Sequence, residues 1–383
     1  MKNAVAIGVI GCGNISDAYF RSLPSFPDVR LAAASDLVME RAKAKAEQYG
    51  FRAMTTEELL NDPEIRLVIN LTTPEFHTAV NKRILMAGKH AYTEKPFGLD
   101  REAGREVLAL AASKGLRTGG APDTFLGGAH QTCRRLVDAG AIGKVVAGTA
   151  FMQCHGHESW HPNPAFYYRR GGGPLFDMGP YYLTALVNLL GPVAEVAAFG
   201  GRAFDEREIT APAATEKSCK VEVDTHIAAV LRFASGALVN LAMSFDVWKH
   251  SLPCIELHGT AGSLPDPNCF GGEVRLFLPH LAEWAKLKLT HGYTDNMRGI
   301  GAADLARSLS GGVPARACGE LAFHVLDVMC GISDSARTGA FVKVQSTCER
   351  PAPLPVDSGT VNLNWRHENE PESIHHLGRL ERP

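Results

Sequence analysis

The sequence predicts two domains: an N-terminal α/β domain with a doubly wound parallel sheet, and a C-terminal α+β domain with a large, mostly antiparallel sheet. Over residues 1–123, strand patterns alternate with helix patterns and the connections are short, which is typical of a parallel sheet. Over residues 124–350, several long strand patterns follow one another, which favours antiparallel pairing. The length of 383 residues also suits two domains with large cores.

Continuous apolar runs define the strands of the first domain, because a strand covered on both faces has no polar alternation. The segments between these runs have helical spacing, and glycines such as Gly50 and Gly115 follow their ends. Asp100 is placed to cap the last helix. We therefore expect strands at 5–10, 29–36, 65–74 and 90–96, and helices after Gly13 and at 39–50, 75–87 and 101–114.

Long strand patterns with hairpin signals mark the second domain. We expect a helix at 125–139, strands within 144–157, 225–245 and 253–264, and helices at 299–310 and 319–336. The stretch "GGGPLFDMGPYYLTAL" (171–186) predicts one helix, with Pro174 in its first turn and with Asp177 and Tyr181 on one face. Residues 351–383 are polar with little periodicity, which predicts a C-terminal tail.

Charge and composition argue against several classes of protein. The net charge is −2 and no long basic run occurs, so neither nucleic acid nor a membrane surface is an expected partner. No apolar run reaches the ~18 residues of a membrane span. The nine cysteines are scattered without a C-x-x-C pair, which favours reduced thiols over a zinc knuckle or a disulfide scaffold. We expect a cytoplasmic protein.

A glycine-rich turn joins the first expected strand to the first helix. Gly11 and Gly13, with Ser16 in the third small position, nearly match the G-x-G-x-x-G fingerprint of dinucleotide-binding turns. Glycines let the backbone N–H groups approach a pyrophosphate closely at a helix N-terminus. Asn14 and Ile15 lie in the same turn and belong to the predicted cofactor site. The alternative is that the glycines serve only a tight turn.

An acidic residue at the end of the second strand indicates which dinucleotide would bind. Asp36 follows Gly13 by 23 residues, which is the place of the acid that holds the ribose diol of NAD. The next residue, Leu37, is not the arginine that would accept a 2′-phosphate. The sequence therefore predicts NAD(H) as the cofactor, in preference to NADP(H).

Four segments together carry a family resemblance: "GVIGCGNIS" (8–16), "NLTTPEFH" (70–77), "AGKHAYTEKP" (87–96) and "GGGPLFDMG" (171–179). On these segments the chain resembles the glucose–fructose oxidoreductase/inositol dehydrogenase (Gfo/Idh/MocA) family of NAD(P)-dependent sugar and cyclitol oxidoreductases. The resemblance covers nearly the whole chain except the tail. It implies a Rossmann domain followed by a mostly antiparallel sheet whose exposed face often serves oligomerisation, so we expect a homodimer or homotetramer.

The resemblance also implies cofactor and substrate contacts. Four residues would lie along the cofactor: Thr72, Thr73, Pro74 and His77. Glu94 would hold the ribose near the nicotinamide, and Lys95 would reach the substrate hydroxyl. Where the usual family pattern G-G-G-x-x-x-D-x-G-x-H has a histidine as proton shuttle, this chain has Tyr181, which resembles the glucose–fructose oxidoreductase branch.

Oxidation of a secondary alcohol needs a base for the hydroxyl proton and a positive group for the developing alkoxide. Lys95 is the candidate for the positive group, because Pro96 confines it to an extended backbone that aims its side chain. Tyr181 is the candidate acid/base, with Lys95 as the cation that lowers its pKa. Asp177 would orient the substrate or pair with Lys95. The alternatives are a surface lysine, a core aromatic and a first-turn acid favoured by the helix dipole.

The loop "HGHESWHPNP" (155–164) precedes the glycine run and offers side chains for a substrate pocket. Its three histidines lack helical i,i+4 spacing and no matching set of carboxylates or thiols accompanies them, so no metal site is expected. Trp160 is instead placed to stack on a sugar ring, and His161 to bind a hydroxyl.

These observations predict an NAD(H)-dependent oxidoreductase that interconverts a hydroxyl and a carbonyl on a sugar, cyclitol or related polyol. Two alternatives stay open. One is a lyase or glycosidase that holds NAD tightly and oxidises a sugar carbon transiently to permit elimination. The other is a non-catalytic regulator that binds NAD or a sugar.

Overall fold

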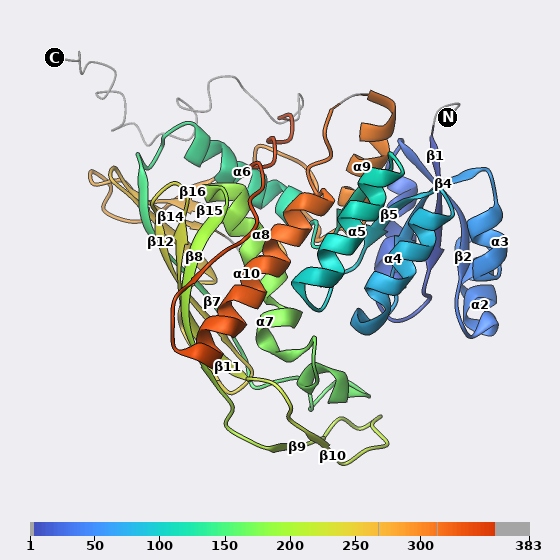
Figure 1. Ribbon diagram of the computed structural model, residues 1–383. Coiled ribbons are helices and arrows are strands. Elements are labelled where there is room, and N and C mark those ends of the chain that lie inside the picture. Colours follow the sequence, from blue (N-terminus) through green and yellow to red (C-terminus); the bar gives the residue numbers. More distant parts are fainter. Residues whose placement is uncertain (1–3, 267, 312, 357–383) are drawn as a thin grey trace.

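Two sheets organise the computed structural model, which describes residues 4–266, 268–311 and 313–356 (Figure 1). The N-terminal sheet is parallel, as the alternating pattern predicts, and it has six strands, two more than the four expected from the sequence. Its apolar runs are buried on both faces, and all six residues of the central strand β1 (Val5–Ile10) are buried. The sheet continues outward on the two sides with β2 (Val29–Ser35) and β3 (Arg52–Ala53), and with β4 (Ile65–Asn70), β5 (His90–Thr93) and β6 (Thr118–Gly120).

Helices connect these parallel strands and begin and end where the sequence signals lie. The Asp100 side chain accepts a hydrogen bond from the Ala103 N–H at 2.9 Å, so it caps the last helix as predicted. Gly50 ends an earlier helix in the left-handed conformation. The helices are α1 (Ser16–Ser22), α2 (Met39–Tyr49), α3 (Thr56–Asn61), α4 (His77–Met86) and α5 (Arg101–Ser113).

The C-terminal sheet has seven strands and is mixed, with every neighbouring pair antiparallel except β7 and β12. Buried and exposed residues alternate strictly along β11, so one face of this strand is exposed in the described chain. In spatial order the strands are β14 (Ser263–Asp266), β13 (Ile255–Gly259), β7 (Val145–Gln153), β12 (Leu238–Ser244), β11 (His226–Phe233), β8 (Val193–Gly201) and β17 (Val342–Lys343).

A layer of helices fills the space between the two sheets (Figure 1). Its longest member is α10 (Gly319–Thr338), which packs on β8 of the C-terminal sheet and on α5 and β6 of the N-terminal domain. Every residue of its neighbour α8 (Gly179–Leu190) is buried. The other helices of the second half are α6 (Gly128–Asp138), α7 (Gly173–Asp177) and α9 (Ile300–Gly311).

The glycine-rich stretch forms two helices, where the sequence predicted one. Helix α7 ends at Asp177, and α8 begins at Gly179 with a proline, Pro180, in its first turn. A proline inside a continuous helix would lack its N–H bond and clash with the preceding turn, so the chain breaks at Met178. Asp177 is therefore the last residue of its helix, and the first-turn explanation for this acid is wrong.

The segment after β17 returns to helix α6. Pro351 and Leu354 are bonded to α6, through Arg134 and Gln131 respectively. The remainder of the predicted tail, 357–383, lies outside the described residues.

Between β8 and β11 a two-stranded ribbon, β9 (Glu206–Glu208) with β10 (Ser218–Lys220), projects from the C-terminal sheet (Figure 1). No helix of the described ranges is long and apolar enough to cross a membrane.

Candidate functional site

The predicted cofactor residues meet at the carboxyl edge of the parallel sheet. The N–H groups of Gly11, Leu71 and Glu94 each donate to the last carbonyl of a neighbouring strand, at 2.8 to 2.9 Å. These bonds align the ends of β2, β1, β4 and β5 side by side. Ligands of open α/β sheets bind outside this edge, where the strand order reverses between β1 and β4.

The β1–α1 turn has the shape that a dinucleotide needs. Gly11 has φ +106°, and a Cβ there would lie 2.7 Å from the carbonyl oxygen of Leu71. A Cβ at Gly13 would meet nothing within 4 Å, so this position faces open space. Asn14 is exposed and Ile15 is half-buried beside it. The turn is therefore closed toward the protein and open on the side where phosphates would sit.

Asp36 lies at the end of β2 with its carboxylate fixed. One oxygen accepts from the Cys12 N–H at 2.8 Å and the other from the Val38 N–H at 2.9 Å. The next side chain, Leu37, is almost fully exposed and offers no cation for a 2′-phosphate. A carboxylate oxygen can accept more than one hydrogen bond, so Asp36 remains able to hold a ribose diol.

The predicted cofactor residues after β4 differ in exposure: three lie at the surface, and the fourth is buried beneath them. Thr72, Thr73 and Pro74 are at least partly exposed at the sheet edge. His77 is buried, and its two ring nitrogens each lie 2.8 Å from a carbonyl oxygen, those of Thr72 and Pro96. Its ring therefore ties the Thr72 segment to the segment that follows β5.

Glu94 and Lys95 follow β5 directly. Glu94 is buried, and its carboxylate accepts from the Tyr19 hydroxyl at 2.8 Å and from the Lys95 N–H at 3.0 Å. The Lys95 side chain crosses to the other domain, where its Nζ donates to Oδ1 of Asp177 at 2.6 Å and to the Asp177 carbonyl at 2.7 Å. The structure thus brings together two predicted site residues that are distant in the sequence.

The charges of this pair stabilise each other. Burial alone would lower the pKa of Lys95, but Asp177, Tyr181 and Glu94 together outweigh it and the pKa of Lys95 rises. Burial would raise the pKa of Asp177, but Lys95 and His157 lower it to about 2. Both groups are therefore charged throughout the neutral range.

Tyr181 lies beside the pair with its hydroxyl held by a residue that the sequence analysis did not single out. The Lys95 Nζ is 5.5 Å from the centre of the Tyr181 ring. Arg298 donates from Nη2 to the phenol oxygen at 3.3 Å. Burial raises the pKa of Tyr181 to about 12, although Lys95 and Arg298 pull it down. No local motif marks Arg298, which stands 117 residues after Tyr181.

The loop histidines are arranged differently from the prediction. The Nε2 of His157 lies 3.3 Å from Oδ2 of Asp177, on the opposite side from Lys95. His161 contacts Tyr167, which lies between it and His157, and its ring accepts a hydrogen bond from the Asn163 N–H at 3.1 Å. Trp160 is 57% exposed. His157 is thus the histidine in contact with the pair, and its position among three histidines of one loop gave no signal for this. Within the described residues, no cluster of His, Cys, Asp or Glu suits a metal ion.

The glycines at the start of α7 allow close packing within the protein itself. A Cβ at Gly172 would lie 2.6 Å from the carbonyl oxygens of Phe166 and Tyr167. Gly173 has φ +72°, and a Cβ there would lie 3.0 Å from the Asp224 carbonyl oxygen. These contacts press the start of α7 against neighbouring backbone and so fix the place of Asp177.

Two family models match the chain, one in each domain. The model described as "Oxidoreductase family, NAD-binding Rossmann fold" matches residues 5–119. The model described as "GFO/IDH/MocA C-terminal domain" matches residues 130–265. Together they bear out the resemblance, the two-sheet fold and the prediction of NAD as cofactor.

Relatives of known sequence include several that are named for sugars or cyclitols. The 1,5-anhydro-D-fructose reductase of Ensifer adhaerens is 26% identical over 67% of this chain and 74% of its own length. The inositol 2-dehydrogenase of Rhizobium meliloti is 26% identical over 69% of this chain and 76% of its own. An uncharacterized oxidoreductase of Schizosaccharomyces pombe, 28% identical, matches 47% of this chain, which spans about half (49%) of that relative.

Solved structures share the fold. A levoglucosan dehydrogenase in complex with NADH and L-sorbose has a TM-score of 0.76 and 20% identity, over 90% of this chain and 100% of that one. An aldose–aldose oxidoreductase from Caulobacter crescentus has a TM-score of 0.73 and 23% identity, over 89% of this chain and 99% of that one. With an NAD-binding Rossmann model on its first domain and the family's own C-terminal model on its second, the chain belongs to the GFO/IDH/MocA family of oxidoreductases.

Proposed function

We propose that this protein moves a hydride between NAD(H) and a ring carbon of a sugar, cyclitol or related polyol, and so interconverts a hydroxyl and a carbonyl. Lys95 is the electrostatic catalyst, Tyr181 the acid/base, and Asp177 the orienting group. The observation that carries the proposal is the partly buried Lys95–Asp177 pair beside Tyr181, built from both domains at the edge of the parallel sheet.

Lys95 has the charge that this chemistry needs, and Tyr181 has the proton-accepting group once its phenol is ionised. The Lys95 ammonium is held by Asp177 and stays positive, so it stabilises the oxygen of a substrate as an alkoxide develops there. The Tyr181 phenolate accepts the hydroxyl proton during oxidation, and the phenol returns it during reduction. Bound NAD⁺ supplies the acceptor for the hydride. Cofactor contacts would come from the β1–α1 turn, Asp36, the Thr72–Pro74 segment and Glu94.

The substrate class rests on the relatives and on the site together. Relatives are named for 1,5-anhydro-D-fructose and inositol, and a structural neighbour for levoglucosan. The side chains around Asp177 combine polar groups with aromatic faces: His157 contacts Tyr167, Trp160 and Phe245 through its ring. Such a mixture suits a ring with several hydroxyl groups.

Two substitutions test the catalytic assignment. We expect Lys95→Met and Tyr181→Phe each to lower kcat by about 10²- to 10⁴-fold on the substrate found in a polyol and sugar panel with NAD⁺. The matched controls are Tyr182→Phe, the buried neighbour in α8, and Lys89→Met, a buried lysine bonded to the Asp62 and Ile65 carbonyls. Full turnover in both test variants would contradict the proposal.

The same panel separates the two alternatives. A lyase or glycosidase would convert its sugar without net NADH, which product analysis detects. A regulator would bind NAD and sugar without exchanging substrate hydrogen. Net NADH formation matched by a ketone or aldehyde product is the result that we expect.

A further inference from the structure

We propose that Arg298 is the positioning residue of Tyr181: its guanidinium fixes the phenol oxygen and supports the phenolate that must take the substrate proton. This inference rests on the proposed role of Tyr181 as acid/base. Arg298 comes from the loop before α9, so it reaches the site from a segment that none of the family motifs in the sequence includes.

The contact geometry is that of a cation held against a phenol. Arg298 is 8% exposed and donates from Nη2 to the Tyr181 oxygen at 3.3 Å. Its guanidinium carbon lies 5.4 Å from the centre of the Tyr181 ring and 5.3 Å from that of Phe270. The Phe270 and Tyr181 rings also meet edge to face at 5.2 Å. The guanidinium is thus enclosed between two aromatic rings with one N–H aimed at the phenol oxygen.

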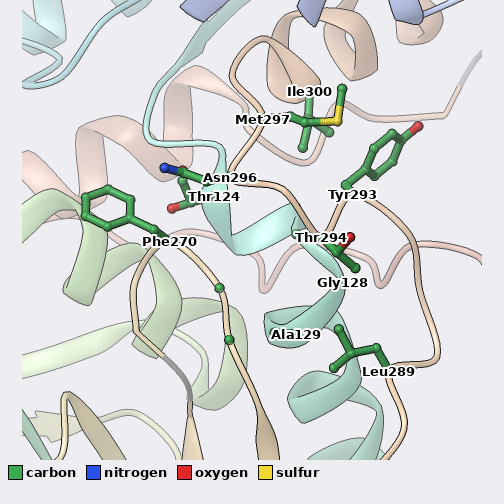
Figure 2. Close-up of a pocket in the computed structure, with 13 residues that line it drawn as sticks. Thr124, Gly128, Ala129, Phe270, Leu289, Tyr293, Thr294, Asn296, Met297 and Ile300 are labelled. Carbon is green, nitrogen blue, oxygen red and sulfur yellow. The ribbon is translucent and has the colours of Figure 1, made fainter.

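The loop that carries Arg298 is shaped to hold it. Oδ1 of Asn296 accepts from the other arm of the guanidinium at 3.0 Å, and the Ser22 hydroxyl donates to the Arg298 carbonyl. Asn296 has φ +51° and Gly299 has φ +86°, both left-handed conformations. Asn296 and Phe270 line the same small cavity (Figure 2). Asparagine adopts the left-handed conformation readily, and there its side chain bonds the guanidinium, so the loop itself helps to fix Arg298.

The direction of the hydrogen bond decides what Arg298 does. A guanidinium has donors and no acceptor, so the phenol oxygen accepts from it and the phenol proton is left for the substrate oxygen. When that proton leaves, the same N–H becomes a charge-assisted bond to a phenolate. Arg298 keeps its charge at all accessible pH values, and the buried carboxylates of Asp123 and Glu94 compensate it.

Several charged and titratable groups act on Tyr181, and two of them favour its phenolate. The ammonium of Lys95 and the guanidinium of Arg298 both lower the pKa of Tyr181, while burial and the carboxylates of Glu94 and Asp177 raise it. The groups that face this phenol are Lys95 and Glu94 after β5, Asp177 at the end of α7, Tyr167 before α7, and Arg298. Lys95 is already bonded to Asp177, which leaves Arg298 as the cation in direct contact with the phenol oxygen.

The first test is the pH profile of kcat/KM for oxidation. In Arg298→Met we expect the rising limb assigned to Tyr181 to move at least one unit to higher pH. At each pH below this limb, kcat/KM is then at least tenfold lower than in the parent protein. Arg298→Lys should recover part of the loss. The control is Arg134→Met, an equally buried arginine that pairs with Asp138 in α6, which should lower stability without moving the limb. An unmoved limb in Arg298→Met would overturn the inference.

The second test measures the phenol itself without turnover. Fluorotyrosine, which has a more acidic phenol, is incorporated into the cofactor-free protein, and the ¹⁹F resonance of position 181 is assigned from its loss in Tyr181→Phe. We expect this resonance to titrate at higher pH in Arg298→Met than in the parent protein. Equal titration in the two proteins would refute the support of the phenolate by Arg298. If the rising limb of the pH profile of kcat/KM persists in Tyr181→Phe, Tyr181 is not the acid/base and the proposed function fails. The ¹⁹F titration still decides whether Arg298 supports the phenolate.

Discussion

At the scale of single residues, Asp177 is the most constrained group of the site. Lys95 binds one carboxylate oxygen and His157 lies against the other, while the Asp177 carbonyl accepts a second bond from Lys95. A side chain bound on both sides cannot rotate without breaking an ion pair in a partly buried place. Asp177 therefore orients its two partners as much as they orient it.

This arrangement predicts how stability depends on pH. The pKa of Asp177 in the folded protein is about 2, below its ordinary value, so its contribution is present above about pH 4 and is lost as the pH falls toward 2. We expect Asp177→Asn to lower the free energy of unfolding by about 2 kcal/mol at pH 7, and by less at pH 3. Urea unfolding at several pH values measures this difference.

The control is an exposed carboxylate. Asp205 pairs with Arg202 at 3.0 Å but is 90% exposed, so Asp205→Asn should change stability by less than about 1 kcal/mol. A difference between wild type and Asp177→Asn that stays constant from pH 7 to pH 3 would show that the carboxylate charge is not what stabilises the pair.

At the scale of secondary-structure elements, two glycines of the β1–α1 turn have different expected roles: one packs against the protein, and the other faces the predicted cofactor site. Gly11 is enclosed and left-handed, whereas Gly13 faces open space. We expect Gly11→Ala to lower the free energy of unfolding by about 1–3 kcal/mol because of strain. Gly13→Ala should leave stability nearly unchanged and raise the Kd for NADH about tenfold, which corresponds to about 1.4 kcal/mol.

Thermal unfolding and NADH titration of both variants check this contrast. Tight NADH binding by Gly13→Ala would place the cofactor phosphates away from this turn. A stable Gly11→Ala would mean that the turn can relax around a methyl group.

Most elements of the first domain are predictable from sequence because their signals are local, whereas the short elements β3, α3 and β6 were not expected. Buried apolar runs, the Asp100 cap and the Gly50 stop mark boundaries that the structure reproduces to within a few residues. The break between α7 and α8 follows from Pro180, a local signal that the prediction of a single helix did not use. The pairing of Lys95 with Asp177 could be expected, since the family resemblance supplied both residues.

Contacts between distant segments were not predictable in this way. Arg298 and His157 join the site through loop conformations that depend on packing of the finished fold, such as the left-handed backbone at Asn296. A single sequence shows an arginine and a histidine at these places and nothing about what they face. Their contacts with Tyr181 and Asp177 form only when distant segments of the second domain pack together.

At the scale of the whole molecule, Arg101 ties the domains together behind the site. The first residue of α5 binds two carboxylates of α10: Nε contacts Asp327, and Nη1 lies 2.6 Å from Oδ2 of Asp334. Asp327 is fully buried and also accepts from the Ser346 N–H at 2.6 Å. Loss of the arginine would leave this carboxylate in the interior with its charge uncompensated.

We therefore expect Arg101→Met to lower the free energy of unfolding by about 3–5 kcal/mol. Arg105→Met, one turn later in α5, removes a half-exposed arginine and should cost less than about 1 kcal/mol. Urea unfolding compares the two variants. Equal stability of both would mean that Asp327 finds other partners or takes up a proton.

The packing of α10 on both sheets has a practical consequence for protein engineering. Phe323 and Leu326 of this helix sit against Gly104 of α5, and Ala322 sits against Gly120 of β6. A fragment that ends after residue 123 would contain the dinucleotide-binding turn, but it would expose to water the surfaces at Gly104 and Gly120 that α10 covers. We expect this fragment to aggregate. A chimera that exchanges C-terminal domains should therefore keep α10 together with the nucleotide-binding half, although the helix lies far from that half along the chain.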